Sequence, residues 1–173
     1  MFRIAFAALV SCLVCFWEAG ASASPPAPRP RTQPVEVLRS LYEAHQPWRN
    51  VEISWTDKRS VLKYFDADLT RLLIEDGTCV RRTKEICRLD FDPIVGSQDF
   101  PDEGFKVEIS SKTSQSTEAL LDVRFQNVEV VTLRFRLRQR RGQWRIADIT
   151  YPDGTTLKTI LSPRKSKNPA DKN

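Results

Sequence analysis

Apolar residues recur at helical spacing in three segments of the first half of the chain. The segment 34–45 begins with a proline, which suits a first helical turn. A second, short helix is expected after Asp57, and a third is expected to start at Asp66 or Asp68 and to stop at Gly77. The pattern predicts three helices, whose apolar faces comprise Val37, Leu38, Leu41, Tyr42, Val61, Leu62, Phe65, Leu69, Leu72 and Leu73.

The hydrophobic period changes to 2 in the second half of the chain. Apolar and polar residues alternate in 105–110, 120–126, 131–141 and 143–151. Strands of this kind have one buried and one wet face, which favours an antiparallel sheet. Residues 140–142, with glycine last, are expected to form the turn before the fourth strand.

The order of these elements indicates the architecture. The helices come first, and a run of about four strands follows. This order predicts an α+β protein with N-terminal helices packed on one face of a curved antiparallel sheet. The segment 155–161 is either a last helical turn or an edge strand. We expect one domain over 34–161, preceded by a proline-rich linker at 24–33 and followed by a disordered basic tail at 162–173.

Residues 1–23 have the three-part pattern of a secretory signal peptide. Arg3 precedes an apolar run at 4–17 that is too short to span a bilayer, and small residues end the segment at Ala23. The residues before Cys12 also look like a lipoprotein processing box, but we rank lipidation second because the preceding apolar run is short. We therefore expect a periplasmic or secreted mature protein without a transmembrane segment.

Export changes the interpretation of the cysteines. Of the four in the chain, Cys79 and Cys87 lie outside the predicted signal peptide. Two cysteines in an oxidising compartment predict a disulfide, with two free thiols as the alternative. A zinc site is not expected, because only two thiols remain and the single histidine, His45, is distant in sequence. The chain shows no phosphate-binding glycine loop and no other cofactor motif, so we expect no cofactor.

The segment LDFDPIVGSQDF, residues 89–100, is the first candidate site. Its acids and amide can line the mouth of a pocket, and one acid can serve as a base if burial raises its pKa. Calcium binding would add Asp102 and Glu103, although the spacing does not match an EF-hand. We favour a structural turn, because Asp92-Pro93 and Gly96 are typical turn residues. The candidate residues are Asp90, Asp92, Gln98 and Asp99.

Asp148 is the second candidate. By parity in the fourth strand it shares a face with Trp144 and Ile146, which is the expected core face. A carboxylate there could line a pocket and act as the acid of an isomerase-like enzyme. A bulge that turns Asp148 outward, or an arginine partner, is the structural alternative that we favour. We therefore predict no catalytic residue and keep Asp148 and the acids of residues 89–100 as weak candidates.

An arginine stripe is the third candidate, and it includes Arg124, Arg134, Arg136, Arg138 and Arg145. With a net charge of +5, this surface would favour an acidic protein, lipid head groups or an envelope polyanion. Nucleic acid is not expected, because the protein is exported and no aromatic residues interleave with the stripe. The alternative is a solvated face on which Asp122 and Glu108 pair across strands. Such a stripe would repel a second copy, so we expect a monomer.

The helical PVEVLRSLYEAH, the loop LDFDPIVGSQDF and the strand QWRIADITYPDG together resemble the bacterial YbjP/YqhG-type exported proteins. The likeness covers roughly residues 34–161. It implies a nuclear-transport-factor-2-like, or cystatin-like, cone and a periplasmic or lipid-anchored location. It supplies no catalytic residues to carry over, and its wider fold includes ketosteroid-isomerase-like enzymes, cyclases and many binding domains.

These observations favour an exported, non-enzymatic binding or accessory protein of the bacterial envelope. It would engage a protein or other anionic partner through the sheet face or the cone mouth, and one version is an immunity-type protein. The alternative is a small-molecule isomerase- or cyclase-like enzyme with an acid in the cone pocket. His45, at a helix end, has no nearby arrangement of serine, cysteine or aspartate residues that would make it a triad member.

Overall fold

The computed structural model describes residues 33–46, 51–98, 106–126 and 130–163. All of them belong to one compact unit, Arg31–Asn173. The predicted signal peptide and almost all of the predicted linker and tail lie outside the described residues, so they stay predictions. None of the described helices is long and apolar enough to cross a membrane.

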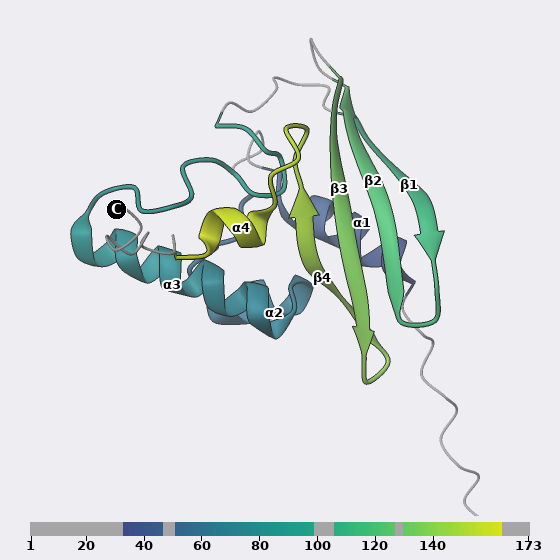
Figure 1. Ribbon diagram of the computed structural model, residues 1–173, viewed down its shortest axis with the longest axis horizontal. Coiled ribbons are helices and arrows are strands. Elements are labelled where there is room, and N and C mark those ends of the chain that lie inside the picture. Colours follow the sequence, from purple (N-terminus) through teal and green to yellow (C-terminus); the bar gives the residue numbers. More distant parts are fainter. Residues whose placement is uncertain (1–32, 47–50, 99–105, 127–129, 164–173) are drawn as a thin grey trace, which may run out of the picture. The chain divides into compact units, whose positions relative to one another are not determined.

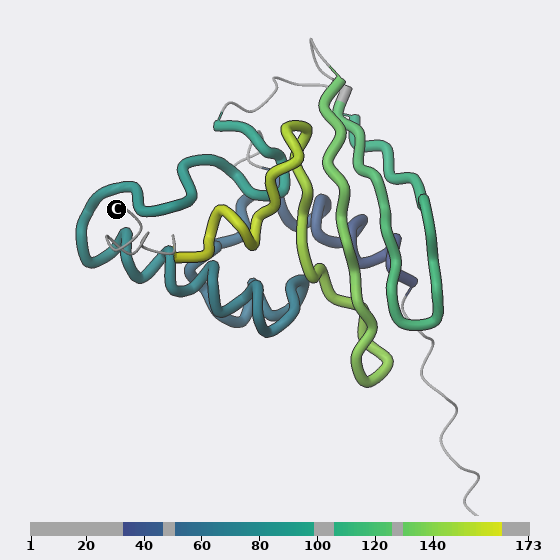
Figure 2. The backbone as a smooth tube through the Cα atoms, viewed as in Figure 1, coloured from purple at the N-terminus to yellow at the C-terminus, as the bar shows by residue number. Residues whose placement is uncertain are grey.

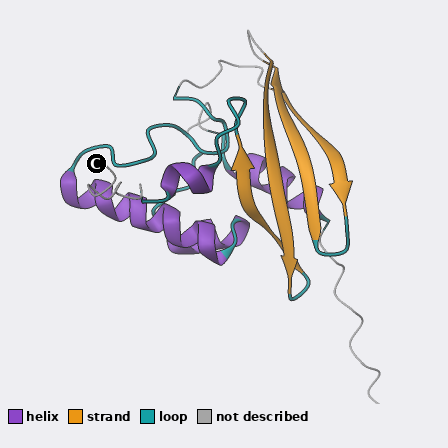
Figure 3. Cartoon of the chain, in the orientation of Figure 1, coloured by secondary structure: helices purple, strands orange, loops and turns teal. Residues whose placement is uncertain are grey.

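α2 and α3 begin at the predicted caps, Asp57 and Asp66, and Figures 1 and 3 show where these helices lie. Asp57 accepts hydrogen bonds from two backbone N–H groups of α2, and Asp66 accepts one from Leu69 in α3. A cap of this kind satisfies N–H groups that have no partner within the helix. The helices within the described residues are α1 (Pro34–Ala44), α2 (Lys58–Tyr64), α3 (Ala67–Thr83) and α4 (Leu157–Leu161). The segment 155–161 therefore contains a short helix rather than an edge strand.

Two details of the helix prediction are wrong. α3 does not stop at Gly77 but continues to Thr83, and Lys84 ends it in the left-handed conformation at φ 63°. Gly77 serves packing instead, since a Cβ there would lie 2.5 Å from Cγ2 of Thr56. In α2, Leu62 is exposed, and Tyr64 takes its expected place in the core.

The predicted strands form one four-stranded antiparallel sheet in the order β1-β2-β3-β4 (Figure 1). Arg141 and Gly142 have φ of 51° and 76°, as a two-residue hairpin turn that matches the strand twist requires. The strands are β1 (Lys106–Ser114), β2 (Glu118–Gln126), β3 (Val130–Arg140) and β4 (Gln143–Thr150). Helices followed by an antiparallel sheet confirm the α+β class.

The core lies between the helices and one face of the sheet. Tyr42 of α1 meets Phe125 and Phe135 edge to face, with ring centroids 5.7 and 6.3 Å apart. The outer edge of β4 is covered, because the N–H of Asp66 donates to the carbonyl of Ile146 at 2.8 Å (Figure 2). Helices thus occupy one face and one edge, while the other face of β1, β2 and β3 carries the polar side chains.

The structure contains the predicted disulfide between Cys79 and Cys87, whose Cα atoms are 6.2 Å apart. Cys79 lies in the last turn-and-a-half of α3, and Cys87 lies in the loop that follows. The bridge therefore closes a short loop at the C-terminal end of α3.

Removing this disulfide is expected to weaken the fold moderately. A crosslink over about ten residues stabilises by about 2–3 kcal/mol, mainly by restricting the unfolded chain. Cys79→Ser/Cys87→Ser should lower the free energy of unfolding in urea by that amount. Wild type unfolded in the presence of reductant is the matched control and should behave like the double variant. Equal stability of the oxidised wild type and the double variant would contradict the prediction.

Candidate functional site

The turn in the loop after α3 is built around Asp92. One carboxylate oxygen, Oδ1, accepts from the backbone N–H groups of Ile94 and Val95 at 2.9 and 3.1 Å. The backbone carbonyl of Asp92 accepts from the N–H of Gly96 at 2.7 Å. Gly96 has φ 74°, and Leu133 and Tyr151 leave little room for a Cβ there. One of the two carboxylate oxygens of Asp92, Oδ1, is therefore occupied by hydrogen bonds from the local backbone.

The other carboxylate oxygen of Asp92 contacts His45, 47 residues earlier in the chain. His45 Nε2 lies 2.6 Å from Asp92 Oδ2, and both side chains are buried. His45 Nδ1 accepts from the N–H of Ile53 at 3.0 Å, so the ring proton must be on Nε2 and is donated to Asp92. This pair ties the end of α1, the segment near residue 53 and the loop together.

Two buried tyrosines hold the same loop from the core side. The Tyr42 hydroxyl donates to the carbonyl of Ile94 at 2.7 Å, and the Tyr151 hydroxyl donates to that of Pro93 at 3.0 Å. Burial, with a smaller effect from Asp92, raises the pKa of both phenols well above the usual value. Both hydroxyls therefore remain neutral donors, and the loop is fixed by side chains from α1 and from the residue after β4.

The remaining candidates of this loop do not join Asp92. Asp90 and Gln98 are exposed, and neither side chain makes a hydrogen bond within the described part of the chain. Asp99, Asp102 and Glu103 lie outside the described residues. Where the structure is described, no three His, Cys, Asp or Glu side chains gather as metal ligands would.

Asp148 does not lie on the core face that parity alone indicates; the alternative that we favour, a bulge and an arginine partner, is confirmed, because the pairing of β3 and β4 shifts by one residue. Arg136 faces Asp148, whereas Leu137 faces Ile146, so Ala147 is the extra residue of a bulge. A one-residue shift moves every later side chain to the opposite face. Asp148 therefore lies on the arginine-bearing face, and Ile149 returns to the core.

Asp148 is nevertheless buried, and both of its oxygens have partners. Oδ2 accepts from Arg136 Nη2 at 3.3 Å. Oδ1 accepts from the backbone N–H groups of Ile149 at 3.0 Å and Lys158, in the first turn of α4, at 3.1 Å. This carboxylate thus joins the bulge, the sheet face and the start of α4.

Three arginines of β3, Arg134, Arg136 and Arg138, form a row of ion pairs on the outer face. Arg134 Nε lies 2.9 Å from Asp122 Oδ1, and Arg138 Nε lies 3.0 Å from Glu118 Oε1. Arg136 pairs with Asp148, so each of these three arginines has an acidic partner on a neighbouring strand. The Arg134 guanidinium bonded to Asp122 holds the pKa of that carboxyl below its usual value. The three arginine side chains remain 38–54% exposed.

The other two arginines of the predicted stripe have different environments. Arg145 Nε donates to the carbonyl of Leu62 at the end of α2, and burial lowers the pKa of its guanidinium. Arg124 is exposed, and among the described residues its side chain makes no hydrogen bond or ion pair. It lines a shallow cleft of about 240 Å³ with Glu108, Phe125 and Val130. Arg124 thus shares the outer face with the β3 row, whereas Arg145 serves to attach α2.

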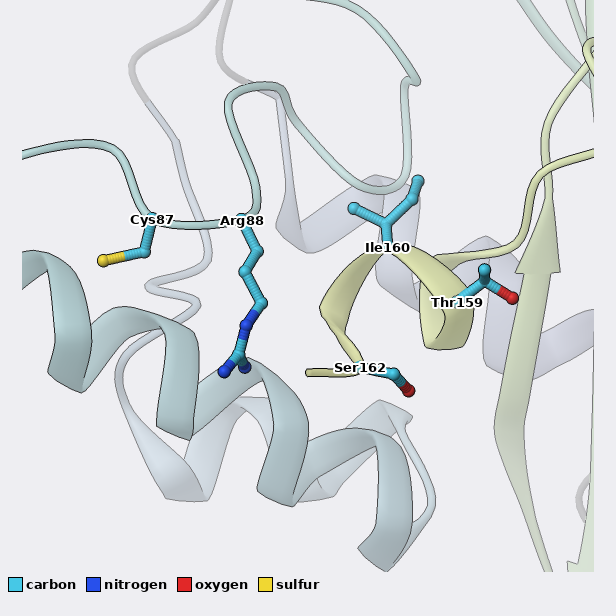
Figure 4. A pocket seen from close by; sticks show the side chains of 5 residues that line it. All are labelled: Cys87, Arg88, Thr159, Ile160 and Ser162. Atoms are coloured by element: carbon cyan, nitrogen blue, oxygen red, sulfur yellow. The ribbon is translucent and has the colours of Figure 1, made fainter. Parts of the chain in front are cut away.

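An open polar cleft of about 600 Å³ lies between α4 and the loop that carries Cys87 (Figure 4). Arg88 crosses this cleft, and its Nη1 donates to the carbonyl of Leu161 at 2.9 Å. Thr159, Ile160 and Ser162 line the opposite wall. Sequence reasoning missed both this cleft and the His45–Asp92 pair, because their members are separated by tens of residues without a shared motif.

No protein-family model matches the chain, and no curated protein matches it. One solved structure, of the phospholipid-binding protein from Ralstonia solanacearum in complex with a phospholipid, shares 12% sequence identity. The match covers 75% of this chain and 69% of that chain, with a TM-score of 0.30. A likeness of this size supports no conclusion about ligands. The chain's own elements define it as an α+β protein with N-terminal helices against a four-stranded antiparallel sheet.

Proposed function

We propose that this chain is an exported, non-enzymatic binding or accessory protein of the bacterial envelope. It engages an anionic partner, of which an acidic protein is the leading class, through the outer face of the sheet. The observation that carries this proposal is the row of Arg134, Arg136 and Arg138, half-exposed and aligned along β3. Export rests on the signal-peptide pattern of residues 1–23.

The acidic partners orient these guanidinium groups without using all of their donors. Arg136 and Arg138 each donate one described hydrogen bond, and Arg134 donates two, whereas a guanidinium has five N–H groups. The row also offsets the burial of the Asp122 and Asp148 carboxylates, but the guanidinium groups themselves remain half-exposed and present their other donors to solvent. Side chains that are already held in place lose less entropy when a partner binds. Arg124 adds positive charge to the same face.

The proposed enzyme alternative is weaker because the buried acids are already engaged. Both oxygens of Asp92 and both oxygens of Asp148 accept hydrogen bonds from the protein itself. Either carboxylate would have to break these bonds before it could take a proton from a substrate. An immunity-type role, in which the sheet face blocks an acidic protein, is compatible with the binding proposal.

A pull-down from an envelope extract tests the sheet face. Arg134→Gln/Arg138→Gln removes two ion pairs from it, one of them to the buried Asp122, and Arg39→Gln/Arg71→Gln removes two exposed pairs from α1 and α3 as the control for lost positive charge. Wild type and the helix control should retain the same defined protein at low salt. The sheet variant should retain at least about tenfold less, since charge pairs at interfaces are worth more than about 1.4 kcal/mol.

Two outcomes of the pull-down would contradict the proposal. Equal retention by the sheet variant and the helix control, with equal melting temperatures, would contradict the sheet-face proposal. Retention of no defined protein by any of the three would contradict the protein-partner proposal as well.

A further inference from the structure

The loop closed by the disulfide carries the most exposed large apolar side chain that the structure describes. Ile86 is 71% exposed, and Val80, on the preceding helical turn, is 37% exposed. α3 extends away from the sheet, and Figure 1 shows this loop at its far end. A single exposed apolar side chain is ordinary in itself, so the surroundings of Ile86 have to indicate whether it has a contact outside the described chain.

Basic side chains surround Ile86. Between residues 81 and 90 the exposed charged residues are four bases, Arg81, Arg82, Lys84 and Arg88, and two acids, Glu85 and Asp90. Three of the bases lie within five residues of Ile86 on its N-terminal side. The loop therefore combines a local excess of positive charge with a projecting apolar group, which an anionic lipid surface matches.

The loop is held in place at several points. The disulfide joins Cys87 to α3, and the N–H of Arg88 donates to the buried carboxylate of Asp76 at 2.9 Å. Arg88 Nη1 also reaches the carbonyl of Leu161 in α4 at 2.9 Å. Thr83 Oγ1 accepts from the N–H of Glu85 at 3.3 Å. The exposure of Ile86 is thus part of a fixed loop conformation, which reduces the entropy lost on docking.

We propose that this loop, residues 79–88, is a membrane-surface anchor. Ile86 enters the interfacial region of an anionic leaflet while Arg82, Lys84 and their basic neighbours contact the lipid head groups. A lipid surface fits better than a protein groove, because one exposed isoleucine and a partly exposed valine offer little of the apolar area that a stable protein interface buries. A basic peptide segment needs no such area at an anionic bilayer, where each Lys or Arg strengthens binding about fivefold.

This anchor is distinct from the sheet face proposed above and does not depend on it. The arginine row belongs to β3, whereas the anchor belongs to the end of α3. A chain with both surfaces would lie on the membrane through the loop and still present Arg134, Arg136 and Arg138 to a partner.

Sedimentation of the purified full chain with vesicles tests the anchor. One set contains phosphatidylglycerol and phosphatidylcholine, and the other contains phosphatidylcholine alone. Wild type should bind the anionic set and bind it less as salt rises. Arg82→Glu/Lys84→Glu, which removes no described side-chain bond, should weaken binding at least about 25-fold. Arg140→Glu/Arg141→Glu, at the β3–β4 turn, changes the net charge equally and should keep most of the binding.

The apolar contact needs its own readout. Ile86→Ser should weaken binding about tenfold, as expected for an isoleucine that enters the interface, and leave the salt dependence unchanged. Ile86→Trp should shift its emission to the blue on anionic vesicles, and brominated lipid should quench it. Val130→Trp, at an exposed position of the sheet, is the matched control and should not respond.

Several outcomes would overturn the anchor. The first is that wild type does not bind anionic vesicles at low salt. The second is that wild type and Arg82→Glu/Lys84→Glu bind these vesicles equally. The third is that the fluorescence of Ile86→Trp does not change when anionic vesicles are added. Binding lost in Arg140→Glu/Arg141→Glu but kept in the loop variant would assign lipid to the sheet instead. All variants share one N-terminus, verified by mass spectrometry, so the apolar run at 4–17 contributes equally to each.

Discussion

Replacing Asp92 with alanine is expected to lower the free energy of unfolding by about 3–5 kcal/mol. The change leaves the N–H groups of Ile94 and Val95 and the Nε2–H of His45 without an acceptor. All three are buried, and each unsatisfied buried donor costs about 1–3 kcal/mol. Urea unfolding followed by circular dichroism measures the effect.

Two further variants separate this mechanism from a general effect of lost charge. Asp92→Asn keeps an acceptor for the turn but can place an amide N–H against the Nε2–H of His45, so it should be destabilising, though less than alanine. His45 cannot move its proton to Nδ1, because Nδ1 accepts from Ile53. Asp90→Ala, two residues away and exposed, should change stability by less than about 0.5 kcal/mol. Similar values for Asp90→Ala and Asp92→Ala would refute the assigned role.

Replacing Asp148 with alanine is expected to destabilise the fold by about 3–4 kcal/mol. The N–H groups of Ile149 and Lys158 lose their acceptor, and Arg136 loses its only described acidic partner. The loss should be greatest where β4 meets α4, because Asp148 in β4 accepts a hydrogen bond from the backbone N–H of Lys158 in α4. Hydrogen exchange should show faster exchange at Lys158 and in the rest of α4.

The conservative variant tests which partner matters more. Asp148→Asn retains an oxygen for the two backbone donors and gives up the charge that faces Arg136. It should therefore lose only about 1 kcal/mol, since Arg136 is 38% exposed and its ion pair is screened. An Asp148→Asn variant as unstable as Asp148→Ala would mean that the ion pair, rather than the backbone bonds, holds this corner.

Sequence periodicity predicted the elements well because each signal is local. Period-2 alternation places Leu121, Val123 and Phe125 on one face of β2 whatever the strand pairs with, and all three are buried. Caps at Asp57 and Asp66 act on donors three residues away or fewer. The disulfide was predicted from compartment and cysteine number, and its short loop required no knowledge of the fold.

The errors concern features that depend on contacts between segments. Gly77 looked like a helix stop, but the approach of Thr56 explains the glycine, and only packing brings the two together. Strand parity alone could not place Asp148, because the bulge that we favour as the alternative is a property of the pairing of two strands. His45 lies at the end of α1, as predicted, but its bond to an acid 47 residues away depends on packing that no local pattern shows.

The amino-acid sequence by itself determined the α+β order, the strand faces, the helix starts and the cysteine pair, because these follow from propensity and periodicity over a few residues. Only the tertiary structure decided what the candidate acids do. The carboxylates of Asp92 and Asp148 are bonded by His45, Arg136 and backbone donors from distant segments. It also decided that the arginine row is paired and that Ile86 projects from a held loop. Burial and bonding arise from long-range packing, which local sequence patterns do not encode.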